Sequence, residues 1–191
     1  MMHGVSADRH TLHYVEWSNG RIDDRKLDEN VHELVYYEAC DSILYIKNGN
    51  GNAAELYMVT GGQDRKLIAQ NTGAIYNSAD QSYYSCSLLS NDGKKALNFT
   101  NLINTEESDL ESHPIASLYG TMHIIDLETG KSTEIAKQVM ANAVLSIMAD
   151  ENMDNIYFMT LDGERLNLCQ YISGEVAVLD NGVMNMLIPT M

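Results

Sequence analysis

Three side chains with oxygen atoms stand at alternate positions in one short segment, a spacing that resembles the start of an ion-binding loop. They are Asp150, Asn152 and Asp154. Alternating oxygen ligands of this kind begin the loop in which some proteins wrap a calcium ion, but that loop ends with a glutamate at about the twelfth position. Leucine stands there instead, at Leu161. The pattern therefore favours a plain turn between strands, and no metal site is predicted.

A second candidate is the segment 101–120, which is rich in acidic side chains and which the repeats described below do not explain. Its charged residues and one histidine are the candidate recognition residues: Glu106, Glu107, Asp109, Glu111 and His113. Long loops on a rigid β scaffold often carry recognition. We therefore expect 101–120 to be a loop insertion that contacts a partner. The alternative, a solvated excursion without a binding role, remains open at this stage.

Motifs that perform catalysis are missing from the sequence. It contains no nucleophile elbow, phosphate-binding loop, His-Glu-x-x-His zinc motif or dinucleotide fingerprint. The six histidines show no metal-ligand spacing, and the three cysteines are far apart with no Cys-x-x-Cys pair. Buried free thiols are the expected state of such cysteines. We predict that the protein is not an enzyme, with no catalytic, cofactor-binding or metal-binding residue and no cofactor.

The charge of the chain restricts its partners. It has 12 basic and 27 acidic residues, which give a formal net charge of −15 at pH 7. Nucleic-acid binding needs clustered lysine and arginine, so nucleic acid is excluded as a partner. An anionic membrane surface is disfavoured for the same reason. Basic surfaces of other proteins are favoured, and a protein partner is expected, while a small ligand also stays possible.

Hydrophobic patterning limits the expected location. No run approaches the roughly 18–20 apolar residues of a membrane span, so no direct membrane insertion is predicted. The first residues, 1–11, contain no apolar leader segment. The location is left open between two alternatives, of which the first is a cytoplasmic protein. If the chain belongs to a longer anchored protein, an extracytoplasmic or cell-surface location is expected instead.

The elements that would position these residues follow from a phrase that occurs four times at the ends of similar blocks. Its copies are Lys26-Leu27-Asp28-Glu29-Asn30-Val31, Lys66-Leu67-Ile68-Ala69-Gln70-Asn71, Glu134-Ile135-Ala136-Lys137-Gln138-Val139 and Ala177-Val178-Leu179-Asp180-Asn181-Gly182-Val183. Short apolar runs repeated about every 40 residues are typical of stacked β units, above all the blades of a propeller.

The prediction is thus an all-β chain, a single β-propeller domain over residues 1–191 with about four blades of four-stranded antiparallel sheet. The approximate blades are 8–30, 31–71, 72–139 and 140–183, and 184–191 is a closing strand or the first strand of a next blade. The ring is either closed by that strand or a fragment of a larger ring, which typically has six to eight blades. Oligomeric state is not predicted.

Three finer expectations concern single strands. In the first blade, 11–17 is predicted as the second strand and 25–27 as the fourth. In the third blade, 83–89 is predicted as the first strand. The segment 135–148 also fits one face of a helix, but its register with the other blocks favours strands.

Two stretches of the third block resemble the repeats of the TolB-type, WD40-like family of bacterial β-propellers. Ser90-Asn91-Asp92-Gly93-Lys94-Lys95 is similar to that family's Ser-Pro-Asp-Gly-Lys-Lys turn, and Asp126-Leu127-Glu128-Thr129-Gly130 is similar to its Asp-x-x-Thr-Gly turn. Asn91 departs from the usual proline, and Asn98 occupies a position that is commonly apolar. The resemblance is diffuse and covers most of 31–191.

The resemblance implies a scaffold, not a specific ligand. Members of the family include translocation-associated periplasmic proteins, lids of prolyl-oligopeptidase-type serine peptidases and many binding modules. A non-catalytic module for protein–protein recognition in a bacterial envelope or at a cell surface is therefore expected. One alternative is an accessory propeller domain of a larger enzyme, such as a peptidase lid. Another is a small-ligand or carbohydrate sensor, to which the eleven tyrosines could contribute stacking surfaces.

Overall fold

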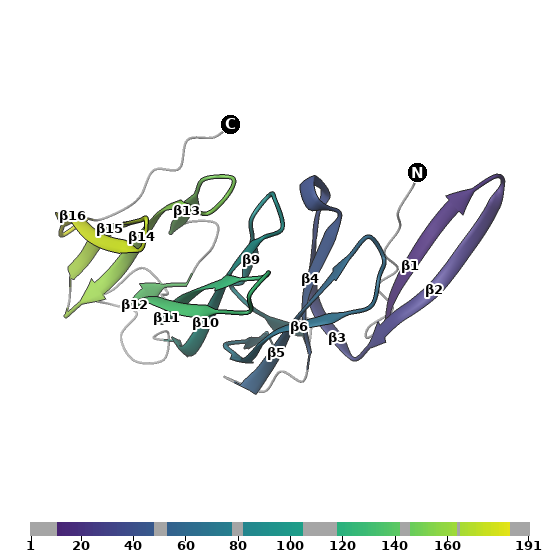
Figure 1. Ribbon diagram of the computed structural model, residues 1–191. Helices are drawn as coiled ribbons and strands as arrows, with labels where there is room; N and C mark the ends of the chain where they lie inside the picture. The colour runs from purple at the N-terminus through teal and green to yellow at the C-terminus, as the bar shows by residue number, and fades with distance from the viewer. Residues whose placement is uncertain are drawn as a thin grey trace. The chain divides into compact units, whose positions relative to one another are not determined.

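The computed structural model describes residues 11–47, 53–77, 82–104, 118–141, 146–163 and 165–183. Strands make up nearly all of the regular structure in these ranges, and the only helical turn within them is the 3-10 turn η1 (Glu38–Cys40). The chain forms two compact units, residues 1–85 and 86–191, which we describe one at a time. Figure 1 labels most of their strands.

Unit 1 begins with a hairpin made of β1 (Thr11–Ser18) and β2 (Arg21–Glu29). Asn19 and Gly20 form its turn with positive φ angles of 52° and 73°, the backbone that a tight hairpin turn requires. The two strands pair directly. The expectation that 11–17 and 25–27 are the second and fourth strands of a blade is wrong, because this Asn-Gly turn makes them neighbours.

The second sheet of unit 1 has four antiparallel strands in chain order. They are β3 (Val31–Tyr37), β4 (Ser42–Lys47), β5 (Ala54–Thr60) and β6 (Lys66–Thr72). This is the four-stranded block expected between residues 31 and 71. The β1–β2 hairpin packs on the sheet through a cluster that includes Leu12, Tyr45 and Val59, each at most 1% exposed. Burying a large apolar side chain stabilises the folded state by about 1.5–3 kcal/mol.

The chain leaves unit 1 through a small sheet of two strands, β7 (Ile75–Asn77) and β8 (Ser82–Tyr84). The expected strand over 83–89 is therefore wrong. Its first residues pair with β7, whereas β9 (Leu88–Leu89) pairs with β10 in unit 2, and the residues in between are not in a strand. The segment is divided because its two ends have different strand partners.

Unit 2 contains two antiparallel groups of four strands. The first group is β9, β10 (Lys95–Asn104), β11 (Leu118–Asp126) and β12 (Ser132–Met140). The second is β13 (Ile147–Ala149), β14 (Asn155–Asp162), β15 (Arg165–Ile172) and β16 (Glu175–Asn181). One backbone pair, Val139 with Thr160, joins β12 to β14. The bounds expected for the third and fourth blades, 72–139 and 140–183, stay a prediction.

An apolar core lies between these two sheets. Leu97, Phe99 and Met122 come from the first sheet, Ile156 and Phe158 come from the second, and all five are fully buried. Both faces of a strand such as β11 are buried along much of its length. Burial on both faces explains why these strands read as unbroken apolar runs instead of alternating patterns.

The fourfold phrase has one structural role in all four sheets: it places a bulge in the last strand. The register shifts within the pairing of β2, β6, β12 and β16 with their neighbours. In each copy a residue near the strand end has a positive φ angle, namely Asn30, Asn71, Gln138 and Gly182. A bulge inserts a residue without a cross-strand partner and bends the strand. The repeat therefore encodes local backbone geometry.

Two sequence expectations concern the strands of unit 2. The preference for strands over 135–148 is confirmed for 135–140 and 147–148, and 142–145 lie outside the described residues. The loop insertion 101–120 is shorter than predicted. β10 continues to Asn104 and β11 starts at Leu118, and these two residues are paired. A register shift after Thr100 lets the ladder resume beyond the point where the regular apolar pattern ends.

Candidate binding pocket in unit 2

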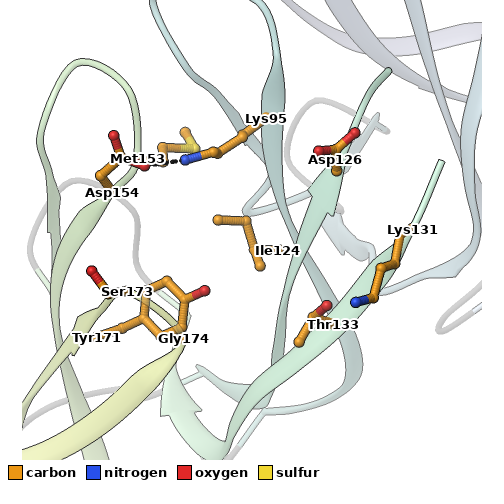
Figure 2. Close-up of a pocket in the computed structure, with 10 residues that line it drawn as sticks. All are labelled: Lys95, Ile124, Asp126, Lys131, Thr133, Met153, Asp154, Tyr171, Ser173 and Gly174. Atoms are coloured by element: carbon orange, nitrogen blue, oxygen red, sulfur yellow. Dashed lines mark hydrogen bonds and ion pairs between the residues drawn. The ribbon is translucent and has the colours of Figure 1, made fainter. Parts of the chain in front are cut away.

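A pocket of about 270 Å³ opens between the two sheets of unit 2. Side chains from both sheets and from their connecting turns line it (Figure 2): Lys95, Ile124, Asp126, Lys131, Thr133, Met153, Asp154, Tyr171, Ser173 and Gly174. The buried side chains Ile124 and Met153 provide its apolar part, at 8% and 3% exposure. The remaining lining is charged, hydroxylated or aromatic.

One ion pair joins the two sheets at the edge of the pocket. The Nζ of Lys95, on β10, contacts the Oδ1 of Asp154, which lies in the turn before β14. Asp154 is 66% exposed, and a pair this open to water contributes only about 0–1 kcal/mol to folding. Its main consequence is positional, because the carboxylate holds the lysine cation at the edge of the pocket.

The turn before Lys95 is built by its own side chains. Ser90 Oγ donates to Asp92 Oδ1 at 2.7 Å and accepts from the Lys95 amide at 2.9 Å. The bond from Ser90, followed by the bond that the Lys94 amide donates to Asp92, lowers the pKa of Asp92. The amide of Asn91 donates to the carbonyl of Glu151 at 2.8 Å and so ties this turn to the turn that carries Asp154. Proline, which is usual at this position in the repeats that the segment resembles, has no N–H to donate. Asparagine at position 91 therefore makes the bond between the two turns possible.

A second turn places Asp126 and Lys131 on the other side of the pocket. Asp126 Oδ1 accepts from the amides of Thr129 and Glu128 at 2.7 and 3.1 Å, and from Thr129 Oγ1 at 2.8 Å. The bonds from Thr129 are the main cause of the lowered pKa of Asp126. This carboxylate is therefore ionised at neutral pH.

The opposite wall is Tyr171 on β15, followed by Ser173 and Gly174 in the turn to β16. In Figure 2 the Tyr171 ring faces the space in front of Ile124, and Thr133 lies on the far strand. Tyr171 is half-buried against the core. An aromatic ring, an apolar base and separated charges of both signs suit the binding of a polar ligand with an apolar part.

No protein-family model matches the chain, and no curated protein matches it. Solved structures do match. Pyrococcus horikoshii acylaminoacyl peptidase is similar with a TM-score of 0.52 and 13% identity over 91% of this chain and 28% of that one. A nidogen/laminin complex is similar with a TM-score of 0.47 and 5% identity over 93% of this chain and 60% of that one. TolB from Acinetobacter baumannii is similar with a TM-score of 0.30 and 16% identity over 85% of this chain and 49% of that one.

This chain thus spans less than two thirds of each of those proteins. The similarity to the acylaminoacyl peptidase, at 13% identity, shows the fold alone. The chain folds as part of a β-propeller. The four-stranded groups β3–β6, β9–β12 and β13–β16 have the form of propeller blades, and β1–β2 is a two-stranded hairpin. The pocket of unit 2 lies between two consecutive blades.

The five candidate recognition residues, Glu106, Glu107, Asp109, Glu111 and His113, lie outside the described residues. Their role in recognition stays a prediction. Residues 150–154 form the turn between β13 and β14, and the absence of a metal site there stays a prediction. Asp150 Oδ1 accepts from the amide of Asp154 at 2.8 Å, and Asp154 pairs with Lys95. Within the described ranges, no group of three or more histidine, cysteine, aspartate or glutamate side chains is arranged to hold a metal.

All three cysteines are free, but only Cys169 is buried, and Cys40 and Cys86 are partly exposed. The expectation of buried thiols therefore holds for one of them. In the part of the chain that the structure describes, no helix has the length and apolar character needed to cross a membrane.

The sequence reading missed a buried charged cluster in unit 1. The side chain of Asp28, on β2, is 1% exposed. Its carboxylate accepts from Lys47 Nζ at 2.5 Å and Tyr45 Oη at 2.8 Å on β4, from Arg65, and from the amide of Glu29 at 2.7 Å. The carboxylate thus ties the β1–β2 hairpin to the following blade.

The pKa values of this cluster show how the charge is stabilised. Burial alone would raise the pKa of Asp28, but the bonds from Lys47, the Glu29 amide and Tyr45 outweigh it and lower the pKa. Burial and the bond to Asp28 raise the pKa of Tyr45. The signal available in the sequence was Asp28, next to Leu27 in the repeat phrase, followed on a later strand by Tyr45-x-Lys47.

Proposed function

We propose that this propeller is a non-catalytic module that binds a segment of a partner protein in the pocket between its last two described blades. The observation that carries the proposal is the pocket itself. Two fixed charged groups, Lys95 and Asp126, and the ring of Tyr171 converge there from separate strands around an apolar base. A rigid concave site with a few placed polar groups is the usual form of a recognition site.

The chemistry of the pocket favours a polar peptide segment with an apolar or aliphatic side chain. The side chain would cover Ile124 and Met153 and contact the face of Tyr171. Charged or amide groups of the segment would meet Asp126 and Lys131, which lie on the same side of the pocket. The net charge of −15 would speed the approach of a basic partner, since complementary charge raises association rates.

The test is selection of binders from a phage-displayed library of random peptides on the immobilised chain. Enriched peptides are then titrated by fluorescence anisotropy. Tyr171→Ala and Lys131→Ala should each weaken binding about tenfold, the loss of roughly 1.4 kcal/mol. Tyr36→Ala is the matched control, because Tyr36 is 41% exposed and lies in unit 1. Peptides that bind equally to all four proteins would refute the pocket as the recognition site.

A second candidate is an accessory propeller of a larger enzyme. The same fold occurs in an acylaminoacyl peptidase, of which this chain matches 28%. A catalytic domain in the same full-length protein would support this role. An anchor or a further interaction domain would support the free-standing binding module, so the full-length reading frame separates the two.

A further inference from the structure

The β1–β2 hairpin and the last described blade end in the same five-residue pattern. Leu27-Asp28-Glu29-Asn30-Val31 ends β2 and begins the next blade, and Leu179-Asp180-Asn181-Gly182-Val183 ends β16. The two copies are identical in sequence only at the leucine, the aspartate and the valine. Their backbones nevertheless share several features.

The shared geometry is specific. In the hairpin, Leu12 pairs with Asp28 and the register skips Leu27. In the last blade, Leu168 pairs with Asp180 and the register skips Leu179. Each aspartate accepts the amide of the residue after it at its Oδ1, at 2.7 Å for Asp28 and 2.8 Å for Asp180.

The residue two positions after each aspartate has a positive φ angle, 57° at Asn30 and 76° at Gly182. Asp180 is therefore the structural counterpart of Asp28. Cross-strand partners lie on one face of a sheet, so each aspartate shares a face with its paired leucine.

The two copies differ in what covers them. Leu12 is fully buried and Asp28 is 4% exposed, because the next blade packs on that face. Leu168 is half-buried, Asp180 is exposed, and Leu179 is 49% exposed. This face is opposite to the one that contributes to the cluster around Phe158. Cys169, the next residue along β15, lies in that cluster, and neighbouring side chains of a strand point to opposite faces. On the face of Leu168, its cross-strand partner Met159 is buried with Tyr119 and Met140, whereas the outer part with Leu179 and Asp180 is exposed.

We propose that the face carrying Leu168, Leu179 and Asp180 docks a β-sheet that presents a tyrosine and a lysine two positions apart on one strand. The first copy of the motif shows why this chemistry fits. Tyr45 and Lys47 stand two apart on β4, and both donate to Asp28. A strand repeat of two residues places such a pair on one face.

The occupant must offer positive charge because the aspartate would lose water on docking. A buried carboxylate is costly unless charged or polar donors replace its hydration. Asp28 obtains those donors from Lys47, Tyr45 and Arg65. Leu179 and Leu168 would provide the apolar contact, as Leu27 and Leu12 do in the first copy. This docking face is separate from the pocket of the proposed function and is independent of it.

The experiment adds a second copy of the sheet that already binds Asp28 in unit 1. In an extended chain, residues 32–72 are repeated directly after Val183 in place of 184–191. Hydrogen exchange is measured at the amides of β16 in the parent and the extended chain. Docking should slow this exchange at least tenfold. Asp180→Asn, or Lys47→Met in the added copy only, should abolish most of the protection and lower the melting temperature of the extended chain by about 5 °C.

Two controls make the result specific. Asp180→Asn should leave the exchange and melting temperature of the parent chain unchanged. Glu175→Gln, which alters another exposed carboxylate on β16, should not affect the extended chain. Equal exchange at β16 in the parent and extended chains would overturn the proposal, whether the added sheet docks elsewhere or stays unfolded. Protection that survives Asp180→Asn would overturn the role of the carboxylate.

Discussion

Substitution of Asp28 by asparagine should destabilise unit 1 strongly. Asparagine has nearly the same shape as aspartate but no charge, so packing is retained while the ion pair is lost. The Lys47 ammonium would then remain with its side chain only 10% exposed and without its counter-ion. Leaving one charge of a buried pair uncompensated costs about 3–5 kcal/mol.

The lower end of that range applies here. The amide oxygen of the new asparagine can still accept one bond from Tyr45 or Lys47, and the Arg65 side chain is 45% exposed and can return to water. We therefore expect a loss of about 3 kcal/mol for Asp28→Asn. A local free-energy change of this size makes amide exchange roughly 150-fold faster where opening of the unit controls it.

The assay is hydrogen exchange followed by mass spectrometry, with separate peptides for β4 in unit 1 and β15 in unit 2. Exchange should accelerate in β4 and stay unchanged in β15. Asp180→Asn is the matched control, since the same motif is exposed there, and it should change neither peptide. Equal exchange of β4 in the two variants would show that the Asp28 cluster adds no net stability.

Acid provides an independent check on the same cluster. The pKa of Asp28 is lowered from the ordinary value of 3.8. A group whose pKa is lower in the folded state stabilises the fold above its unfolded pKa, and the stabilisation is lost as the pH falls through the folded pKa. The wild type should therefore lose more of the stability of unit 1 than Asp28→Asn does when the pH is lowered below about 4. Parallel acid dependences would contradict this reasoning.

Three further predictions concern other contacts. Asn91→Pro removes the amide bonded to Glu151 and should cost about 1 kcal/mol in urea unfolding of unit 2, whereas Asn91→Ala should be nearly neutral. Burial raises the pKa of Glu33 above its ordinary value of 4.5, so stability is lost as the pH rises through the raised value; Glu33→Gln should suppress this loss in urea titrations carried out at increasing pH. Gly62→Ala places a Cβ 2.7 Å from the Tyr14 ring at a φ of 64°, and thermal melts should show a destabilisation of more than about 1 kcal/mol; unchanged melts would contradict the clash.

The strands could be predicted from sequence where two local signals agreed. The blade β3–β6 has apolar β-branched runs such as that in β4, and glycine turns such as Gly61-Gly62 separate them. Prediction was wrong where the deciding signal was a strand partner. Nothing within 83–89 shows that its two ends pair with different strands, because pairing depends on residues far along the chain.

The pocket was harder to predict than the blades. Lys95, Asp126 and Asp154 were each visible in a turn motif, and each motif was interpreted as a turn. Their convergence depends on the packing of two blades, and it brings Asp154 to Lys95 from 59 residues away. A turn pattern specifies its own backbone but not which turn of the next blade lies opposite. Site prediction from repeats therefore requires the register between blades, which short motifs do not contain.

The two copies of the leucine–aspartate motif separate local from tertiary information. Both produce the bulge, the bond to the following amide and the positive φ angle, so these features follow from the local sequence. Only Asp28 is buried, and only it has the lysine, tyrosine and arginine donors. Burial of the aspartate is therefore supplied by the neighbouring blade and not by the motif. A sheet that covers Asp180 must then bring its own donors, and this requirement is a stricter criterion for a partner of that face than apolar area alone.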